Sequence, residues 1–386
     1  MDTSDTIQKT KYQAELFSNR LKKKYKELRK WARKNRISCY RLYDRDIPEI
    51  PLSVDIYEFL PDQADSVLEA ARFISEQNAR LSANDQTVEK DIKERTFAVI
   101  YLYERPYEKS EEDEKNWLDA MTQSAAGVLG IEITHIIQKE RSHKSHKDDQ
   151  QYQKNEKGIE VSGLVMEMGQ LFCVDLTSYL DTGLFFDHRP LRSKIRDTVS
   201  KKRVLNLFCY TGSFSVYAAQ GNAAYVESVD LSNTYLARAK ENMLRNGFSD
   251  KKKYAFTKAD CIRFLQEKAV AAKSGKLKAE QLYNLIILDP PTFSNSKASD
   301  NVLDINRDWP QLVKDCLNIL APGGTLYFST NSERLKFDIT KIPAKTAGGL
   351  DFTWKDITED SIPQDFTGKK PHKLWEFILK NETSKY

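Results

Sequence analysis

Cysteine is scarce in this sequence and follows no metal-binding or redox spacing. The five cysteines are widely separated and no two form a Cys-x-x-Cys pair; they are Cys39, Cys173, Cys209, Cys261 and Cys316. This usage argues against a disulfide framework, a zinc site and an iron–sulfur site. It is typical of a protein in a reducing cytoplasm, which is where we expect the chain to act.

Long apolar runs are also missing. No stretch approaches the ~20 apolar residues of a membrane-spanning helix, and residues 1–10 are polar, unlike a signal peptide. We therefore expect neither a membrane partner nor export. Hydrophobic residues still make up 40% of the 386, which excludes a wholly disordered or collagen-like chain. This length is typical of two domains plus an extension.

Net charge is nearly absent, at +4, so only the distribution of charge can indicate a partner. Residues 20–36 hold ten Lys or Arg and one acid, Glu27. Apolar residues recur through this stretch at the spacing of one helix face; they are Phe17, Leu21, Tyr25, Leu28 and Ala32. We therefore predict that residues 1–36 form a basic amphipathic helix, docked by its apolar stripe.

The cationic face of this helix is predicted to bind the phosphates of a nucleic acid. The residues expected to do so are Arg20, Lys22, Lys23, Lys24, Lys26, Arg29, Lys30 and Arg33. A solvated helix face and, less favoured, a membrane surface are the alternatives, and the membrane reading lacks a broad apolar face to insert.

Residues 37–180 have a mixed pattern that predicts a small α+β domain, assigned to RNA binding. Strand-like runs lie at residues 53–57, 96–103, 131–137 and 164–176, and helical patterns at residues 64–80 and 114–129. Residues 138–157 are polar without periodicity and predict a long exposed loop. His143 and His146 lie in it, but no third ligand is near, so we predict no metal site.

Residues 181–386 alternate apolar runs with helical segments, which predicts an α/β domain with a doubly wound, mostly parallel sheet. The expected strands are residues 203–208, 225–230, 254–258, 282–288 and 324–329, with edge strands at 351–357 and 373–379. In such sheets ligands bind at the carboxyl ends of the strands, where the strand order reverses.

Three of these strands end in residues that suit a nucleoside. The first strand runs into a turn with one glycine, Gly212. The second strand ends at Asp230, where an acid can accept both ribose hydroxyls. The third strand is followed by Asp260 and Cys261, which are placed to read adenine. The turn lacks the Gly-x-Gly-x-x-Gly of dinucleotide sites, whereas S-adenosylmethionine carries no phosphate and tolerates it. The alternatives are small buried residues for the cysteines and a helix cap for Asp230.

The fourth strand ends in Asp289-Pro290-Pro291, followed two residues later by Phe293. Two successive prolines form a stiff turn, because each has a fixed φ and no amide hydrogen. Such a turn suits a platform that presents an aromatic ring to a planar substrate, with Asp289 near the transferred methyl group. We expect these four residues to be catalytic; a plain strand-ending turn is the alternative.

The chain resembles the class I, S-adenosylmethionine-dependent RNA methyltransferases, which have a Rossmann-like sheet. More closely, it is similar to the C-terminal, guanine-N7-methylating half of the bifunctional bacterial large-subunit (23S) ribosomal RNA methyltransferases. The segments that carry the resemblance are residues 17–49, DTGLFFDHRPLR (181–192), LNLFCYTGSFSV (205–216), residues 230–247, ADC (259–261), LDPPTFSNSK (288–297) and QDFTGKKPHKLW (364–375).

The resemblance implies a cofactor site for S-adenosylmethionine built from Phe208, Tyr210, Thr211, Gly212, Asp230, Leu231, Asp260, Cys261 and Asp289. It also places Asp187 and Arg189 near the methionine end of the cofactor, where Arg189 could pair with the carboxylate. The guanine-N2-methylating half of the fused proteins has no counterpart here, so we expect a stand-alone enzyme.

The target atom is selected mainly by the resemblance. Cytosine C5 methylation needs a thiolate nucleophile, and neither the fourth nor the fifth strand ends in cysteine. Guanine N7 has a free lone pair, so no proton must leave and orientation suffices. The alternatives are guanine N2 or adenine N6, for which the match of the double-proline turn is partial, cytosine C5, and a non-catalytic RNA-binding protein.

Overall fold

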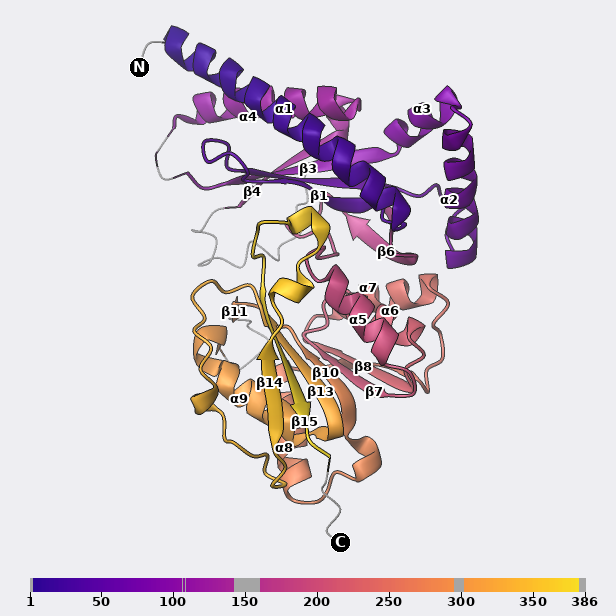
Figure 1. Cartoon of the computed structure of the whole chain (residues 1–386), viewed down its shortest axis with the longest axis vertical. Coiled ribbons are helices and arrows are strands. Elements are labelled where there is room, and N and C mark those ends of the chain that lie inside the picture. The colour runs from indigo at the N-terminus through magenta and orange to yellow at the C-terminus, as the bar shows by residue number, and fades with distance from the viewer. Residues whose placement is uncertain (1–2, 106, 108, 142–159, 295–301, 382–386) are drawn as a thin grey trace. The chain divides into compact units, whose positions relative to one another are not determined.

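The chain divides into two compact units, residues 1–186 and 187–386 (Figure 1). The computed structural model describes residues 3–105, 107, 109–141, 160–294 and 302–381. Because the first unit extends to residue 186, the boundary predicted at residue 181 is too early. The physical reason is that Thr182 and Phe186 are held by the first unit: the Thr182 hydroxyl hydrogen-bonds Tyr57 at 2.9 Å, and the Phe186 ring lies 5.6 Å from the Tyr57 ring.

The first unit is an α+β fold that includes the N-terminal helix. Its elements are α1 (Thr3–Lys34), β1 (Cys39–Asp44), β2 (Leu52–Glu58), α2 (Val67–Ser82), α3 (Gln86–Glu94), β3 (Thr96–Tyr103), α4 (Glu111–Leu129), a 3-10 turn (Ile133–His135), β4 (Ile136–Arg141), β5 (Ser162–Glu167) and β6 (Gln170–Asp175). One sheet has the order β1-β2-β3-β4, in which only β4 is parallel to its neighbour, and β5 and β6 form a hairpin.

Helix α1 is docked through the stripe that its sequence predicts. Phe17, Leu21, Leu28 and Ala32 are at most 2% exposed. They belong to one core with side chains of β1, β2, β3 and α4, and α1 packs along α4 and β1 (Figure 1). The helix thus forms part of the first unit, not a separate segment.

Two strand predictions in this unit are wrong in detail. The apolar run at residues 164–176 is a hairpin, because Met168 and Gly169 both take left-handed φ values, of 50° and 88°, and reverse the chain. The run at residues 131–137 is a 3-10 turn followed by β4. The loop predicted at residues 138–157 begins inside β4, and its remainder, with His143 and His146, lies outside the described residues.

The second unit is the doubly wound α/β domain. Its elements are α5 (Arg189–Thr198), β7 (Arg203–Leu207), α6 (Ser213–Gln220), β8 (Tyr225–Asp230), α7 (Asn233–Arg245), β9 (Tyr254–Lys258), α8 (Cys261–Lys273), a 3-10 turn (Ala279–Gln281), β10 (Tyr283–Leu288), β11 (Phe293–Ser294), β12 (Leu303–Asp304), α9 (Ile305–Asn318), β13 (Leu320–Thr330), three further 3-10 turns (Ile339–Lys341, Glu359–Ser361, Gln364–Phe366), β14 (Phe352–Asp356) and β15 (Lys373–Leu379).

Its seven-stranded sheet has the order β14-β15-β13-β10-β7-β8-β9. The five strands from β13 to β9 are parallel, and β15 runs antiparallel to both of its neighbours, β13 and β14. Of the two predicted edge strands only β14 lies at the edge, because β15 pairs on both sides. The chain proceeds from β7 outward to β9 and returns at β10, so the strand order reverses between β7 and β10.

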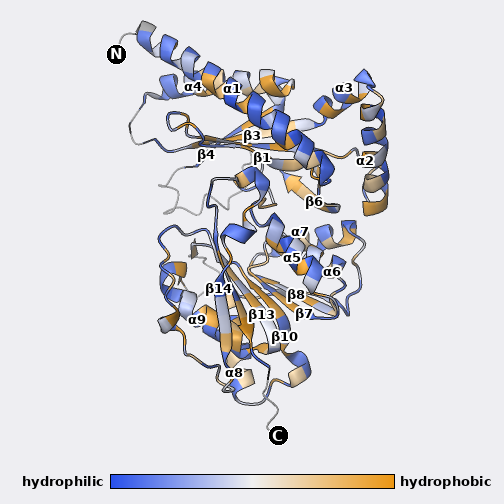
Figure 2. Ribbon diagram, in the orientation of Figure 1, coloured by the Kyte–Doolittle hydropathy of each residue, from blue (hydrophilic) through white to orange (hydrophobic). Residues whose placement is uncertain are grey.

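Helices cover both faces of this sheet. Side chains that alternate along β7 and β10 enter two separate cores: Val204 and Leu285 pack with α5 and α6, whereas Leu205 and Ile286 pack with α8 and α9. Figure 2 shows the central strands as mainly hydrophobic, as expected for a parallel sheet buried on both faces. In the described ranges, no helix combines the length and the apolar character that crossing a membrane requires.

Candidate cofactor and catalytic site

The candidate site is built at one edge of the sheet of the second unit. Register aligns the strand ends, because Leu207 of β7 pairs with Leu288 of β10 on one side and Val229 of β8 on the other. The residues that follow, among them Phe208, Asp230 and Asp289, therefore emerge side by side. The sequence prediction that these acids share an edge is confirmed by the pairing.

The turn after β7 has an unusual backbone. Phe208, Tyr210 and Gly212 have φ values of 54°, 50° and 73°, all in the left-handed region. Two of them are aromatic residues, for which this conformation carries strain. Thr211 between them is buried, and its carbonyl accepts a hydrogen bond from the Asn242 side chain at 2.8 Å. The turn is thus held in shape from outside.

Gly212 is required by space as well as by conformation. A Cβ atom there would lie 2.8 Å from Cβ of Ala239 on α7. We expect Gly212→Ala to lower the free energy of unfolding by about 2–4 kcal/mol, from overpacking added to left-handed strain. Gly247→Ala is the matched control, because Gly247 has a φ of 83° and nothing within 4 Å of its Cβ position. Urea denaturation that shows equal losses for both variants would contradict the steric argument.

Asp230 joins the ends of two strands. Its Oδ2 accepts the Tyr210 amide hydrogen at 3.0 Å, and its Oδ1 accepts the Ser232 amide at 2.9 Å. Ser232, not Asp230, caps α7, so the alternative that Asp230 is the helix cap is wrong. Burial raises the pKa of the Asp230 carboxyl, opposed by these backbone hydrogen bonds. Leu231, beside it, is half-buried.

Asp260 and Cys261 both have structural duties at the start of α8. Asp260 caps the helix, accepting the Ile262 amide at 2.8 Å. The Cys261 sulfur lies 3.2 Å from the Phe208 amide and 3.4 Å from the Val229 carbonyl, which ties the ends of β7 and β8 together. Burial raises the pKa of the Cys261 and Cys209 thiols. Their assignment as small buried residues accounts for these contacts, and adenine recognition by Asp260 and Cys261 stays a prediction.

Asp289 is surrounded by polar partners. It accepts a hydrogen bond from the Ser329 hydroxyl, and its Oδ2 lies 3.5 Å from Nε2 of His188. Burial alone would raise the pKa of Asp289, but the attraction of His188 and the hydrogen bonds from His188 and Ser329 outweigh it and hold this pKa below the ordinary value. Asp289 is therefore an ionised carboxylate at neutral pH.

His188 and His372 were not predicted from the sequence. His188 precedes α5 and His372 precedes β15; their rings stack 4.3 Å apart. Asp187, a predicted cofactor residue, binds Nδ1 of His372 at 2.9 Å and lies 3.9 Å from Nε2 of His188. The His188 pKa is raised: burial lowers it, but Asp289 and Asp187 outweigh burial. The sequence signal that could have found them is that both histidines lie in segments that carry the family resemblance, residues 181–192 and 364–375.

The Asp187, His188 and His372 ligand atoms lie within 4.8 Å of one another, close enough in principle to hold a metal ion. However, both nitrogens of His372 are engaged, Nδ1 by Asp187 and Nε2 by the Ser361 hydroxyl at 2.8 Å. A metal would have to displace these hydrogen bonds. The geometry is that of a charged cluster in which Nε2 of His188 lies 3.9 Å from Asp187 and 3.5 Å from Asp289.

The remaining predicted residues of this unit have mixed surroundings. Arg189 is 2% exposed and forms an ion pair with Asp365 at 2.8 Å, a partner that the sequence did not indicate. Its pairing with the methionine carboxylate stays a prediction.

In the double-proline turn, Pro290 is buried and Pro291 half-buried, whereas Phe293 is 44% exposed. Phe293 pairs with Asp304 in the short β11–β12 ladder, so its backbone is fixed while its ring is accessible.

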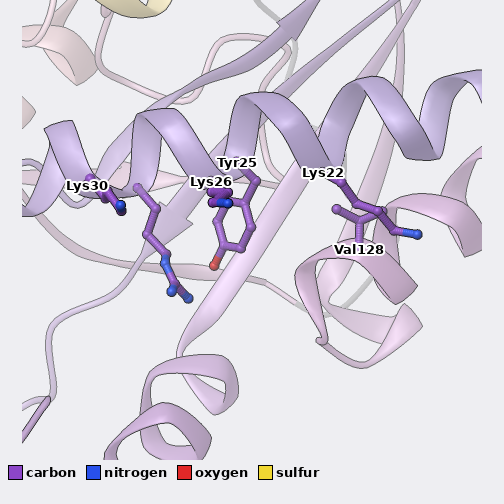
Figure 3. Close-up of a pocket in the computed structure, with 6 residues that line it drawn as sticks. Lys22, Tyr25, Lys26, Lys30 and Val128 are labelled. Atoms are coloured by element: carbon purple, nitrogen blue, oxygen red, sulfur yellow. The ribbon is translucent and has the colours of Figure 1, made fainter. Parts of the chain in front are cut away.

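The eight cations predicted to bind RNA lie on α1 in the first unit, on different sides of the helix. Arg20 and Lys24 contact Asp46, at 2.7 and 3.6 Å. Four others line a hollow with Tyr25 and Val128; they are Lys22, Lys26, Arg29 and Lys30 (Figure 3). Lys23 is exposed and Arg33 half-buried.

Comparison with known proteins identifies the family. Residues 96–365 match the S-adenosylmethionine-dependent methyltransferase family. The chain is 37% identical to ribosomal RNA large subunit methyltransferase K of Neisseria meningitidis over 95% of this chain and 87% of that protein. It is 36% identical to ribosomal RNA large subunit methyltransferase K/L of Magnetococcus marinus over 94% of this chain but only 42% of that protein, so it spans under half of the K/L length.

Solved structures agree on the fold. The crystal structure of SMU.776 complexed with SAH superimposes with a TM-score of 0.65 at 19% identity, covering 95% of this chain and 81% of that one. The predicted α/β, doubly wound, mostly parallel fold is thereby confirmed. The chain belongs to the family of S-adenosylmethionine-dependent methyltransferases, and S-adenosylmethionine is its cofactor.

Proposed function

We propose that this chain methylates guanine N7 in large-subunit ribosomal RNA. The substrate class is supported by the names of the relatives, which are ribosomal RNA large subunit methyltransferases. The observation that carries the choice of atom is Asp289, an ionised carboxylate with a lowered pKa at the strand end beside the cofactor turn. A fixed negative charge suits a reaction whose product base is positively charged.

The residues of the turn fit the cofactor. S-adenosylmethionine supplies a methyl group on a positively charged sulfur and has no phosphate. Accordingly the turn offers one glycine and no cluster of cations. The Asp230 carboxylate accepts backbone hydrogens from Tyr210, Ser232 and Leu231, and because a carboxylate has about four acceptor positions, it retains room for a ribose hydroxyl.

The alternative target atoms need chemistry that this edge does not favour. Cytosine C5 methylation needs a thiolate, but the thiols at this edge, Cys209 and Cys261, are buried and have raised pKa values. An exocyclic amine must lose a proton, and the lowered pKa of Asp289 makes it a weak base for that purpose. Guanine N7 needs neither, so Asp289 would act by charge, and the exposed Phe293 ring by stacking on the base.

Nucleoside mass spectrometry of ribosomal RNA tests the target atom. We expect large-subunit RNA from cells without this protein to lose 7-methylguanosine at one position, and the purified chain to restore it in vitro with S-adenosylmethionine. A lost N2-methylguanosine, N6-methyladenosine or 5-methylcytidine instead would contradict the N7 assignment. Unchanged nucleosides in both experiments would contradict the ribosomal RNA substrate.

A further inference from the structure

We infer that the cationic hollow on α1 is a binding site for successive phosphates of an RNA backbone. It has a volume of about 280 Å³ and is lined by Lys22, Tyr25, Lys26, Arg29 and Lys30 of α1 and by Val128 of α4. Figure 3 shows Lys22, Lys26 and Lys30 following one another along α1, with the Tyr25 ring between them and Val128 below Lys22. The inference rests on the proposed RNA substrate and assigns it a place on the surface.

Seven of the eight cations predicted to bind RNA fall into two groups with different surroundings, and the eighth, Lys23, is exposed and belongs to neither group. Arg20 and Lys24 bind Asp46, whose side chain is 4% exposed, so one of their two positive charges is neutralised within the protein. The periodicity of 3.6 residues per turn puts the other group on one side of the helix; it consists of Lys22, Lys26, Arg29, Lys30 and Arg33. The predicted set of RNA-binding cations is thereby narrowed to this side.

Among the described residues, the lysines of the hollow have no competing carboxylate. Lys22, Lys26 and Lys30 are exposed, and across the part of the chain that the structure describes no carboxylate forms an ion pair with them. Arg29 has only a loose contact with Glu89, 3.8 Å long with both side chains well exposed. Such exposed pairs contribute little, so four positive charges remain available for an anionic ligand.

The spacing of the lysines fits a polymer of phosphates. Lys22, Lys26 and Lys30 are four residues apart, which is about 6 Å along a helix that rises 1.5 Å per residue. Successive phosphates of an RNA strand are separated by a similar distance. Arg29, whose guanidinium carbon lies 5.5 Å from the centre of the Tyr25 ring, is held between the lysines. A guanidinium held against a ring is pre-organised for a phosphate.

A membrane surface is a poorer occupant of this face. Binding to lipid headgroups would require apolar side chains beside the cations to enter the bilayer. The apolar stripe of α1 is instead buried in the core of the first unit, where Phe17 and Leu21 are 0% exposed. The contact we infer is to the backbone and independent of sequence, so it would position the RNA without selecting the target base.

The test is RNA affinity as a function of salt for the full chain and a triple variant, Lys22→Gln with Lys26→Gln and Lys30→Gln. The probe is a fluorescent fragment of large-subunit ribosomal RNA. Because each phosphate contact contributes about 0.7–0.9 to the slope of log affinity against log salt, the variant should lose about 2–3 from the slope. At 0.1 M salt we expect the affinity to fall roughly 100-fold.

The matched control removes the same charge elsewhere. Lys251, Lys252 and Lys253 are consecutive exposed lysines before β9, and their replacement by Gln should leave the slope within about 1 of the parent value. Equal losses in both variants, or an unchanged slope in the first, would overturn the inference. The inference would also be overturned if the triple variant of Lys22, Lys26 and Lys30 lost binding to phosphatidylserine vesicles but kept its RNA binding. Because the readout is affinity, it is independent of whether guanine N7 is the methylated atom.

Discussion

Replacing Asp289 by Asn is expected to slow methyl transfer about 100- to 1,000-fold, the loss typical of removing one group that stabilises charge in a transition state. Asn keeps the size of the side chain and can still accept the Ser329 hydroxyl hydrogen, so the change removes mainly the negative charge. That charge lies where the strand order reverses, beside the turn after β7. Cofactor affinity should change less than the rate, because the carboxylate proposed to accept the ribose hydroxyls is that of Asp230.

The measurement is single-turnover transfer of a labelled methyl group to ribosomal RNA, with S-adenosylmethionine affinity determined by calorimetry on the same preparations. Asp315→Asn is the control, because Asp315 is a buried carboxylate that lies on α9 and accepts a hydrogen bond from Gln311 at 2.7 Å. If the Asp289 variant transferred methyl groups at the parent rate, the proposed electrostatic role would be wrong. If it lost cofactor affinity as much as rate, Asp289 would be a binding residue instead.

The strand ends of the second unit were predictable from sequence because parallel strands buried on both faces leave long apolar runs. The runs at residues 203–208 and 282–288 match β7 and β10, the central parallel strands, to within one residue. Once the strands are parallel, their carboxyl ends must share an edge, so Asp230 and Asp289 could be placed together without coordinates. Half-exposed elements were harder: α3 buries only Val88 and Ile92 and was not predicted.

The partners of the predicted acids could not be found in the same way. His188 and His372 are 184 residues apart, yet their rings stack, and each contacts a carboxylate of the site. No periodicity links them, because each lies just outside a helix or strand and its position depends on how β15 inserts beside β13. The same holds for Arg189, whose buried partner Asp365 comes from a turn late in the chain. The local sequence pattern predicts which strands end in acidic residues. The packing of segments that are distant in the sequence determines which side chains contact these acids and so shift their pKa values.

Replacing Asp230 by Ala is expected to lower S-adenosylmethionine affinity about 100-fold, as two hydrogen bonds to a charged acceptor are lost. The physical reason is twofold. The variant lacks the carboxylate proposed to accept the ribose hydroxyls, and it leaves the amides of Tyr210 and Ser232 without their acceptor. Since Tyr210 has a φ of 50°, the turn that should enclose the cofactor would lose one of the contacts that hold it.

Asp250→Ala provides a close control for this substitution. The Asp250 carboxylate accepts the amide of the residue two positions later, Lys252, at 2.9 Å, just as Asp230 accepts that of Ser232. However, Asp250 precedes β9 and therefore lies at the amino end of the parallel strands, opposite the candidate site. Calorimetry should find parent affinity in the Asp250 variant and weak binding in the Asp230 variant. Equal affinities in the two would show that the cofactor does not lie against the end of β8, and the placement of the whole site would have to be abandoned.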